Sequence, residues 1–191
     1  MKANQPRIYL AGPEVFLPPA LNRQVVATKK DILAALGMQG CDPLDTELSV
    51  ASDESPQAQA AAIYRANIEL LSACQGCIAN LSPFRGVSAD PGTVFEVGYA
   101  LAAGLPVTAF SAVAGHYMAR VHHTDGIDAQ GFSVERFELH DNLMMECGIA
   151  AGGGQVFFGN RSPSELPLRP EQLFDEAAFK LAAVALVQLL R

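Results

Sequence analysis

Residues Ser88–Pro106 have the sequence SADPGTVFEVGYALAAGLP, a short polar turn followed by a mostly apolar segment. The turn surrounds Pro91, and the apolar spacing after it predicts a helix over Thr93–Ala103. A glycine and a proline end that helix, and Val107–Phe110 is expected to be a strand. A short helix that leads directly into an apolar strand is typical of the α/β class.

Glu96 is the one charged side chain of this predicted helix. Unpaired N–H groups and a partial positive charge at a helix N-terminus favour an ionised, fixed carboxylate there. Such a carboxylate is suited to act as a nucleophile. Two structural alternatives use the same residues. Thr93–Glu96 fits a capping box, and Asp90 followed by Pro91 fits an N-cap with proline at the first helical position.

The composition of the 191 residues predicts one globular domain over 1–191, because half of the residues are hydrophobic and charged residues are sparse. The net charge of −7 and the lack of a basic cluster argue against a nucleic-acid polymer as partner. A small molecule is the expected ligand.

The N-terminal residues have no apolar run long enough for a signal peptide, and no run reaches the ~20 residues of a membrane helix. We therefore expect a cytoplasmic protein without a membrane partner, and reduced cysteines. Cys74 and Cys77 form a CxxC pair, but no second pair or histidine cluster accompanies them. Burial is the favoured interpretation of this pair, and no metal or cofactor is predicted.

Strands and helices alternate along the rest of the chain. The expected strands are 7–11, 38–41, 77–81, 107–110 and 156–158, and the expected helices are 20–36, 57–73, 93–103, 143–150 and 171–190. Apolar runs without alternation suit a parallel sheet covered on both faces. The pattern predicts an open, mostly parallel five-stranded sheet with helices on both faces. The irregular segment 111–140 is expected to be a binding or interface loop.

Ligands of such sheets bind at the carboxyl ends of the strands. The loops expected to meet there are Gly12–Phe16, Pro43–Asp45, Ser82–Asp90 and the segment that follows Phe110. The first strand is not followed by GxGxxG, which argues against a dinucleotide.

Four blocks, in this order, resemble the nucleoside 2-deoxyribosyltransferases. They are Ile8–Phe16 (IYLAGPEVF), Asn80–Gly86 (NLSPFRG), Asp90–Ala100 (DPGTVFEVGYA) and Asp141–Met144 (DNLM). The resemblance covers about residues 7–145 and leaves 152–191 as a C-terminal extension with a helix.

The resemblance implies a flavodoxin-like (Rossmann-like) sheet and a ping-pong exchange of 2-deoxyribose between nucleobases, without a cofactor. By position, Glu96 matches the nucleophile, Asp90 matches a carboxylate that holds the deoxyribose, and Tyr9 matches a tyrosine near the nucleophile. Asn142 matches an asparagine that a neighbouring subunit inserts into the site, which implies a homo-oligomer. The further predicted substrate-binding residues are Gly12, Phe16, Asp45, Ser82, Arg85, Gly92 and Met144.

The implied partners are 2′-deoxynucleosides and free nucleobases. Where some members of the family have an aspartate proposed as general acid, this chain has Asn67, so Asp45 or Asp90 has to be considered as proton donor. The chemistry is coherent, because a carboxylate both stabilises the oxocarbenium-like charge of a breaking N-glycosidic bond and captures the sugar. The AGPEVF and SPFRG blocks resemble the purine-preferring members of the family more than those that accept all bases, which implies a preference for purines.

Two other functions remain open. One is a 2′-deoxynucleoside 5′-monophosphate N-glycosidase, which is a hydrolase. Its phosphate would meet Gly12-Pro13-Glu14, where an acidic side chain facing the phosphate would repel it. The other is a non-catalytic nucleotide-sensing module, which would bind its ligand without exchanging bases.

Overall fold

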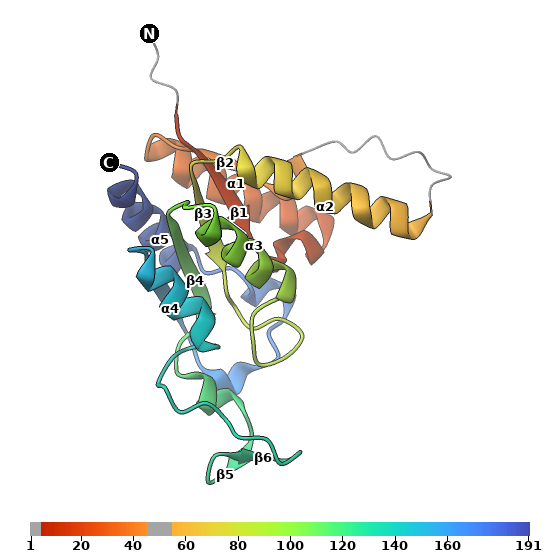
Figure 1. Ribbon diagram of the computed structural model, residues 1–191, viewed down its shortest axis with the longest axis vertical. Coiled ribbons are helices and arrows are strands. Elements are labelled where there is room, and N and C mark those ends of the chain that lie inside the picture. The colour runs from red at the N-terminus through yellow and green to blue at the C-terminus, as the bar shows by residue number, and fades with distance from the viewer. Residues whose placement is uncertain (1–4, 46–54) are drawn as a thin grey trace.

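The computed structural model describes residues 5–45 and 55–191. Its main sheet has five strands in the order β2-β1-β3-β4-β7, and all neighbours pair in parallel (Figure 1). The strands are β1 (Arg7–Ala11), β2 (Gln39–Cys41), β3 (Gly76–Asn80), β4 (Val107–Val113) and β7 (Val156–Arg161). The predicted flavodoxin-like α/β class is confirmed.

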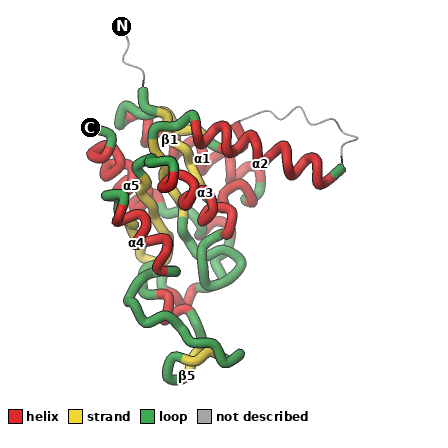
Figure 2. Tube along the Cα trace, in the orientation of Figure 1, coloured by secondary structure: helices red, strands yellow, loops and turns green. Residues whose placement is uncertain are grey.

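Helices cover both faces of the sheet (Figures 1 and 2). The helices are α1 (Pro19–Ala35), α2 (Pro56–Ser72), α3 (Pro91–Ala102), α4 (Leu143–Ala151) and α5 (Glu176–Leu189). On one face α1 packs against β2 and α5 against β4 and β7, whereas α3 and α4 pack together on the other face. No helix among residues 5–45 and 55–191 is long and apolar enough to cross a membrane.

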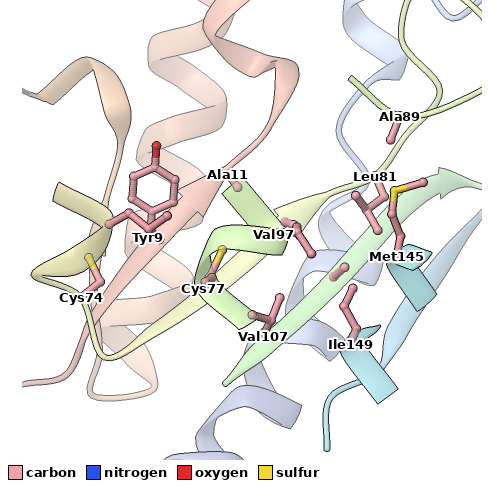
Figure 3. Packing of buried hydrophobic residues seen from close by; sticks show 14 of the residues in the cluster. Tyr9, Ala11, Cys74, Cys77, Leu81, Ala89, Val97, Val107, Met145 and Ile149 are labelled. Atoms are coloured by element: carbon pink, nitrogen blue, oxygen red, sulfur yellow. The ribbon is translucent and has the colours of Figure 1, made fainter. Parts of the chain in front are cut away.

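Alternate side chains of β1 enter two separate cores. Ile8 and Leu10 pack with α1 and α5, whereas Tyr9 and Ala11 pack with residues of α3 and α4. Figure 3 shows part of the second core, in which Tyr9 lies in one cluster with Cys77 and Val97. Both faces of the strand are buried, which is the reason for its continuous apolar sequence. This alternation also determines which β1 side chains can reach α3.

The C-terminal helix is shorter than the sequence predicts. Residues Pro170–Gln172 form a separate 3-10 turn, and the Asp175 side chain caps α5 by accepting a hydrogen bond from Ala178 N (2.9 Å). The carbonyl of Leu173 accepts hydrogen bonds from side chains at the ends of the strands instead of continuing the helix. The helix expected over 171–190 is therefore wrong in its first five residues.

Segment 111–140 is not wholly irregular. Its first residues extend β4, and the rest forms an arm that projects from the sheet (Figure 1). The arm contains a 3-10 turn (Tyr117–Arg120) and a small antiparallel pair, β5 (His123–Thr124) with β6 (Ile127–Asp128). Further 3-10 turns are Pro13–Phe16, Pro43–Asp45 and Pro163–Glu165. Cys74 and Cys77 are free thiols and both are buried.

Gly154 determines how closely β7 approaches β4. A Cβ at this position would overlap the backbone carbonyl oxygen of Val107. Gly98, on α3, has open space around the position of a Cβ. An added methyl group would therefore clash with the backbone at Gly154 but not at Gly98.

We expect Gly154→Ala to destabilise the protein by roughly 1–3 kcal/mol, because the backbones of β4 and β7 must separate. Gly98→Ala should stabilise it by about 0.5–1 kcal/mol, since alanine is the better helix former. Urea unfolding measures both. Equal effects of the two substitutions would contradict the close packing at Gly154.

Candidate active site

A cavity of about 460 Å³ opens at the carboxyl edge of the sheet. Its volume lies in the range typical of small-molecule sites. Its walls come from the turns after β1 and β2 and from α2 and α3. The lining residues are Gly12, Val15, Phe16, Pro43, Leu44, Ile63, Asn67, Asp90, Gly92, Thr93 and Glu96.

The parallel register places these segments side by side. Tyr9 is level with Cys41 on one side and with Cys77 on the other. The turns that follow β1 and β2 therefore emerge next to each other, beside the segment after β3. The connection after β1 leads to β2 on one side of the sheet, and the connection after β3 leads to β4 on the other side. The crevice at such a reversal is where α/β sheets bind ligands. The segment after Phe110 was also expected here, but it does not line this cavity.

Helix α3 begins at Pro91, with Asp90 as its N-cap. Asp90 Oδ2 accepts hydrogen bonds from Thr93 N (2.9 Å) and Thr93 Oγ1 (3.2 Å). The N-cap interpretation of Asp90 is therefore confirmed, and the capping box over Thr93–Glu96 is wrong. The helix starts two residues before the predicted position, and Glu96 lies beyond its first turn.

Glu96 faces the cavity and is bonded to β1. Its Oε1 atom accepts a hydrogen bond from the Tyr9 hydroxyl at 2.6 Å, across 87 residues of sequence. The Tyr9 side chain is fully buried, so it presents its hydroxyl to Glu96 from a fixed position. The carboxylate is thus held by tertiary structure and not by its own helix.

The pKa of Glu96 is raised to about 7, mainly by burial; the hydrogen bond from Tyr9 lowers this pKa, and the negative charges of Asp90 and Asp42 raise it. The sequence-based expectation was an ionised carboxylate stabilised by the helix N-terminus. That expectation fails because the effect of the helix dipole fades after the first turn, while desolvation acts on the whole carboxylate. A carboxyl group with this pKa changes its charge near neutral pH.

The Tyr9 hydroxyl is itself strongly influenced by its surroundings. Its burial and the adjacent Glu96 carboxylate raise its pKa far above the ordinary value for tyrosine. Tyr9 is therefore a neutral hydrogen-bond donor at every physiological pH. It orients one oxygen of Glu96 and leaves the second oxygen for another role.

Of the predicted substrate-binding residues, Gly12, Phe16 and Gly92 line the cavity together with Asp90 and Glu96. Phe16 is half exposed and stacks on Phe84 with ring centroids 5.2 Å apart. The Arg85 guanidinium lies over both rings, 4.9 Å and 4.7 Å from their centroids. Arg85 thus contacts Phe16 but does not line the cavity.

Asp45 and Ser82 have other neighbours. Asp45 is paired with Lys30 and accepts a hydrogen bond from Asp42 N. Ser82 is fully buried, and its hydroxyl bonds the carbonyl of Leu173 and the amide of Ala112. Neither side chain lines the cavity.

Asn142 and Met144 lie outside the cavity as well. Asn142 Oδ1 accepts a hydrogen bond from Met144 N (3.1 Å), and its Nδ2 donates to Glu135 (2.9 Å). Met144 is 73 % exposed at the start of α4. Within one chain, these two residues do not meet Glu96.

Two acidic residues near the site, Asp42 and Glu14, are buried, which the sequence did not indicate. Asp42 is buried, and desolvation raises its pKa. Asp42 directly follows the predicted strand 38–41, and this position was the sequence signal that could have placed it near the site. Glu14 was expected to face the ligand, but it is buried and paired with Lys29 and Asn80, so that expectation is wrong. Its charge is neutralised inside the fold.

Comparisons with known proteins identify the family of the chain. The family model described as nucleoside 2-deoxyribosyltransferase matches residues 8–144. An uncharacterized protein of Schizosaccharomyces pombe is 35 % identical in an alignment of 172 residues, and the match covers 79 % of this chain and 80 % of that protein.

Solved structures are similar too. A 2-desoxiribosyltransferase from Leishmania mexicana is 32 % identical with a TM-score of 0.58, covering 73 % of this chain and 85 % of its own. A conserved protein from Enterococcus faecalis V583 shares the fold, with 22 % identity, a TM-score of 0.52 and coverage of 89 % and 98 %. The predicted resemblance is confirmed, and the chain belongs to the nucleoside 2-deoxyribosyltransferase family.

Proposed function

We propose that this protein transfers 2-deoxyribose from one nucleobase to another by a ping-pong mechanism in which Glu96 is the nucleophile. The observation that carries the proposal is the short hydrogen bond from Tyr9 to a cavity-lining Glu96 whose partners are not its own backbone. The bond leaves Oε2 of Glu96 as the attacking atom.

In the first step the Glu96 carboxylate bonds to the anomeric carbon as the N-glycosidic bond breaks, and the electron pair of that bond leaves with the base. In the second step a nitrogen of the incoming base bonds to the same carbon, and the carboxylate departs with its electron pair. The carboxylate stabilises the oxocarbenium-like charge in both steps. Two displacements at one carbon retain its configuration.

The departing base needs a proton, and the incoming base must lose one. Asp45 is engaged with Lys30, whereas Asp90 lines the cavity and its described hydrogen bonds all use Oδ2. We therefore assign both contact with the sugar and proton exchange with the base to Asp90. Asn67 offers a neutral amide to the base edge from α2.

The cavity favours a nucleoside over its 5′-monophosphate. Glu14 does not face the ligand, so repulsion by Glu14 is not the reason. The described lining holds two carboxylates, Asp90 and Glu96, and no lysine or arginine. A phosphate in this cavity would meet like charge without a cation. The apolar walls around Phe16 and Ile63 suit a flat base, and a purine is the proposed preference.

The site is proposed to be completed by a second copy of the chain. Asn142 and Met144 are matched by the resemblance to substrate contacts, yet both lie outside the cavity of their own chain. A homo-oligomer would bring these residues to the neighbouring cavity. Their exposure at the start of α4 supports this arrangement.

Glu96→Ala is expected to reduce transfer of deoxyribose from deoxyinosine to adenine by at least ~10³-fold, because no covalent intermediate can form. Chromatographic separation of the nucleosides measures the exchange. Glu69→Gln, which changes an exposed carboxylate on α2, is the control and should retain activity.

Transfer of deoxyribose by the Glu96→Ala variant would disprove the mechanism. Turnover of the 5′-monophosphate in preference to the nucleoside would support the hydrolase. Binding without exchange by the unaltered protein would support the sensing module.

Tyr9→Phe should move the acidic limb of the kcat/KM profile to higher pH. The nucleophile must be deprotonated, so activity is expected to rise with pH through the Glu96 pKa of about 7. The Tyr9 hydrogen bond stabilises the carboxylate, and its loss raises that pKa. A limb that stays in place or moves to lower pH would show that this bond does not act on the nucleophile.

Glu96→Gln should stabilise the fold more at pH 8 than at pH 5. Between its ordinary pKa and about 7, the folded carboxyl keeps a proton that the unfolded chain releases, so wild-type stability falls as pH rises. Glutamine removes this loss, and the gain at pH 8 should exceed the gain at pH 5 by roughly 2–3 kcal/mol. Urea unfolding at both pH values measures it. Equal gains at the two pH values, or a gain by Glu69→Gln, would contradict the raised pKa.

A further inference from the structure

The wall of the cavity after β1 rests on a buried ion pair. Glu14 is 3 % exposed and Lys29 is 2 % exposed, and Lys29 Nζ donates to Glu14 Oε1. The same oxygen accepts a hydrogen bond from Asn80 Nδ2 at 2.8 Å. Burying two charges is expensive, and removing one partner leaves the other without compensation. The pair therefore strongly constrains the position of Glu14.

Lys29 is held in turn by the C-terminal part of the chain. Its Nζ lies over three aromatic rings, 5.4 Å from the centroid of Phe110, 5.6 Å from Phe174 and 5.7 Å from Phe179. Such rings stabilise a desolvated cation through their negative faces. Phe174 and Phe179 lie beyond residue 144, where the family match ends.

Asn80 connects the ion pair to the same segment. Its Nδ2 also donates to the carbonyl of Leu173 at 3.0 Å, and its Oδ1 accepts from Ser82 N at 2.9 Å. The Ser82 hydroxyl donates to the same Leu173 carbonyl at 3.1 Å and accepts from Ala112 N at 2.8 Å. The Leu173 carbonyl is thus bonded to the ends of the strands.

The ion pair reaches the cavity through Gly12. The second oxygen of the Glu14 carboxylate lies so close to Gly12 that a Cβ there would overlap it, and this buried oxygen has no hydrogen-bond partner among the described residues. Asn22 Nδ2 also donates to the Glu14 carbonyl at 2.9 Å. Gly12, Val15 and Phe16, on either side of Glu14, all line the cavity.

The geometry points to Lys29 as a positioning residue for substrate binding, acting through Glu14 on the Gly12–Phe16 wall, with segment 173–179 as its support. The inference rests on the proposed function for the identity of the ligand. Tyr9 and Glu96 belong to the α3 side of β1, whereas Lys29 packs on the α5 side. The network therefore sets the binding wall and not the nucleophile.

The variants are Lys29→Met, Glu14→Gln and the combination of the two. Each single change leaves the other member of the ion pair buried without its partner charge. We therefore expect KM for deoxyinosine to rise at least fivefold while kcat stays within threefold of the wild-type value. The acidic limb of the pH profile should not move. In the double variant both charges are gone and glutamine still accepts from Asn80, so KM should return to within twofold of wild type. Lys180→Met, which breaks the exposed pair with Glu176, is the matched control and should change neither constant.

Hydrogen exchange of the unliganded proteins supplies a readout that does not depend on activity. Amides of residues 14–17 should exchange at least tenfold faster in Lys29→Met, with α3 unchanged, and should recover in the double variant. If the wild-type protein does not transfer deoxyribose between nucleobases, the proposed function is disproved, whereas the positioning role of Lys29 is still decided by the hydrogen-exchange result. Unchanged protection of residues 14–17, a fall in kcat at constant KM, or no recovery in the double variant would overturn the positioning role. If Lys29→Met does not fold, Glu14→Gln and the double variant decide by the same criteria.

Discussion

The site depends on the placement of one carboxylate against one buried phenol. Tyr9 alternates with its neighbours on β1, and this alternation directs its ring into the core beneath α3. Its hydroxyl meets Glu96 at 2.6 Å, where burial disfavours the charge and the hydrogen bond restores part of it. A carboxylate balanced between these effects is not over-stabilised as an anion, which suits the proposed role of Glu96 as nucleophile. Stronger pairing with a cation would make it a poorer nucleophile and a better leaving group.

Both cores of the sheet contribute to the cavity, in different ways. The core under α3 and α4 holds Tyr9 and, through it, the Glu96 carboxylate. The core under α1 and α5 contains the aromatic rings around Lys29 and anchors the turn after β1. The two meet at Gly12, where the chain leaves β1 and where no side chain would fit. A change of packing in either core is therefore expected to alter the same cavity.

The C-terminal segment has more importance than its absence from the family match suggests. It completes the sheet with β7 and covers it with α5. It also brings Leu173 and Phe174 to the carboxyl edge, next to the ends of β3 and β4. Because these contacts are buried, salt screens them much less than exposed contacts. The segment is part of the structure that shapes the cavity.

The sequence by itself determined the elements and the chemical type of the site. Apolar runs predicted the five strands, and the isolated charge of Glu96 marked the helix that carries the proposed nucleophile, because periodicity and capping are local properties. Tertiary structure alone decided that Tyr9 holds Glu96 and that Glu14 turns inward to Lys29. It also began the C-terminal helix five residues later than predicted and left Asn142 outside its own cavity. The contacts of Glu14, Glu96 and Leu173 depend on desolvation and on partners 15 to 93 residues away, which no local pattern encodes.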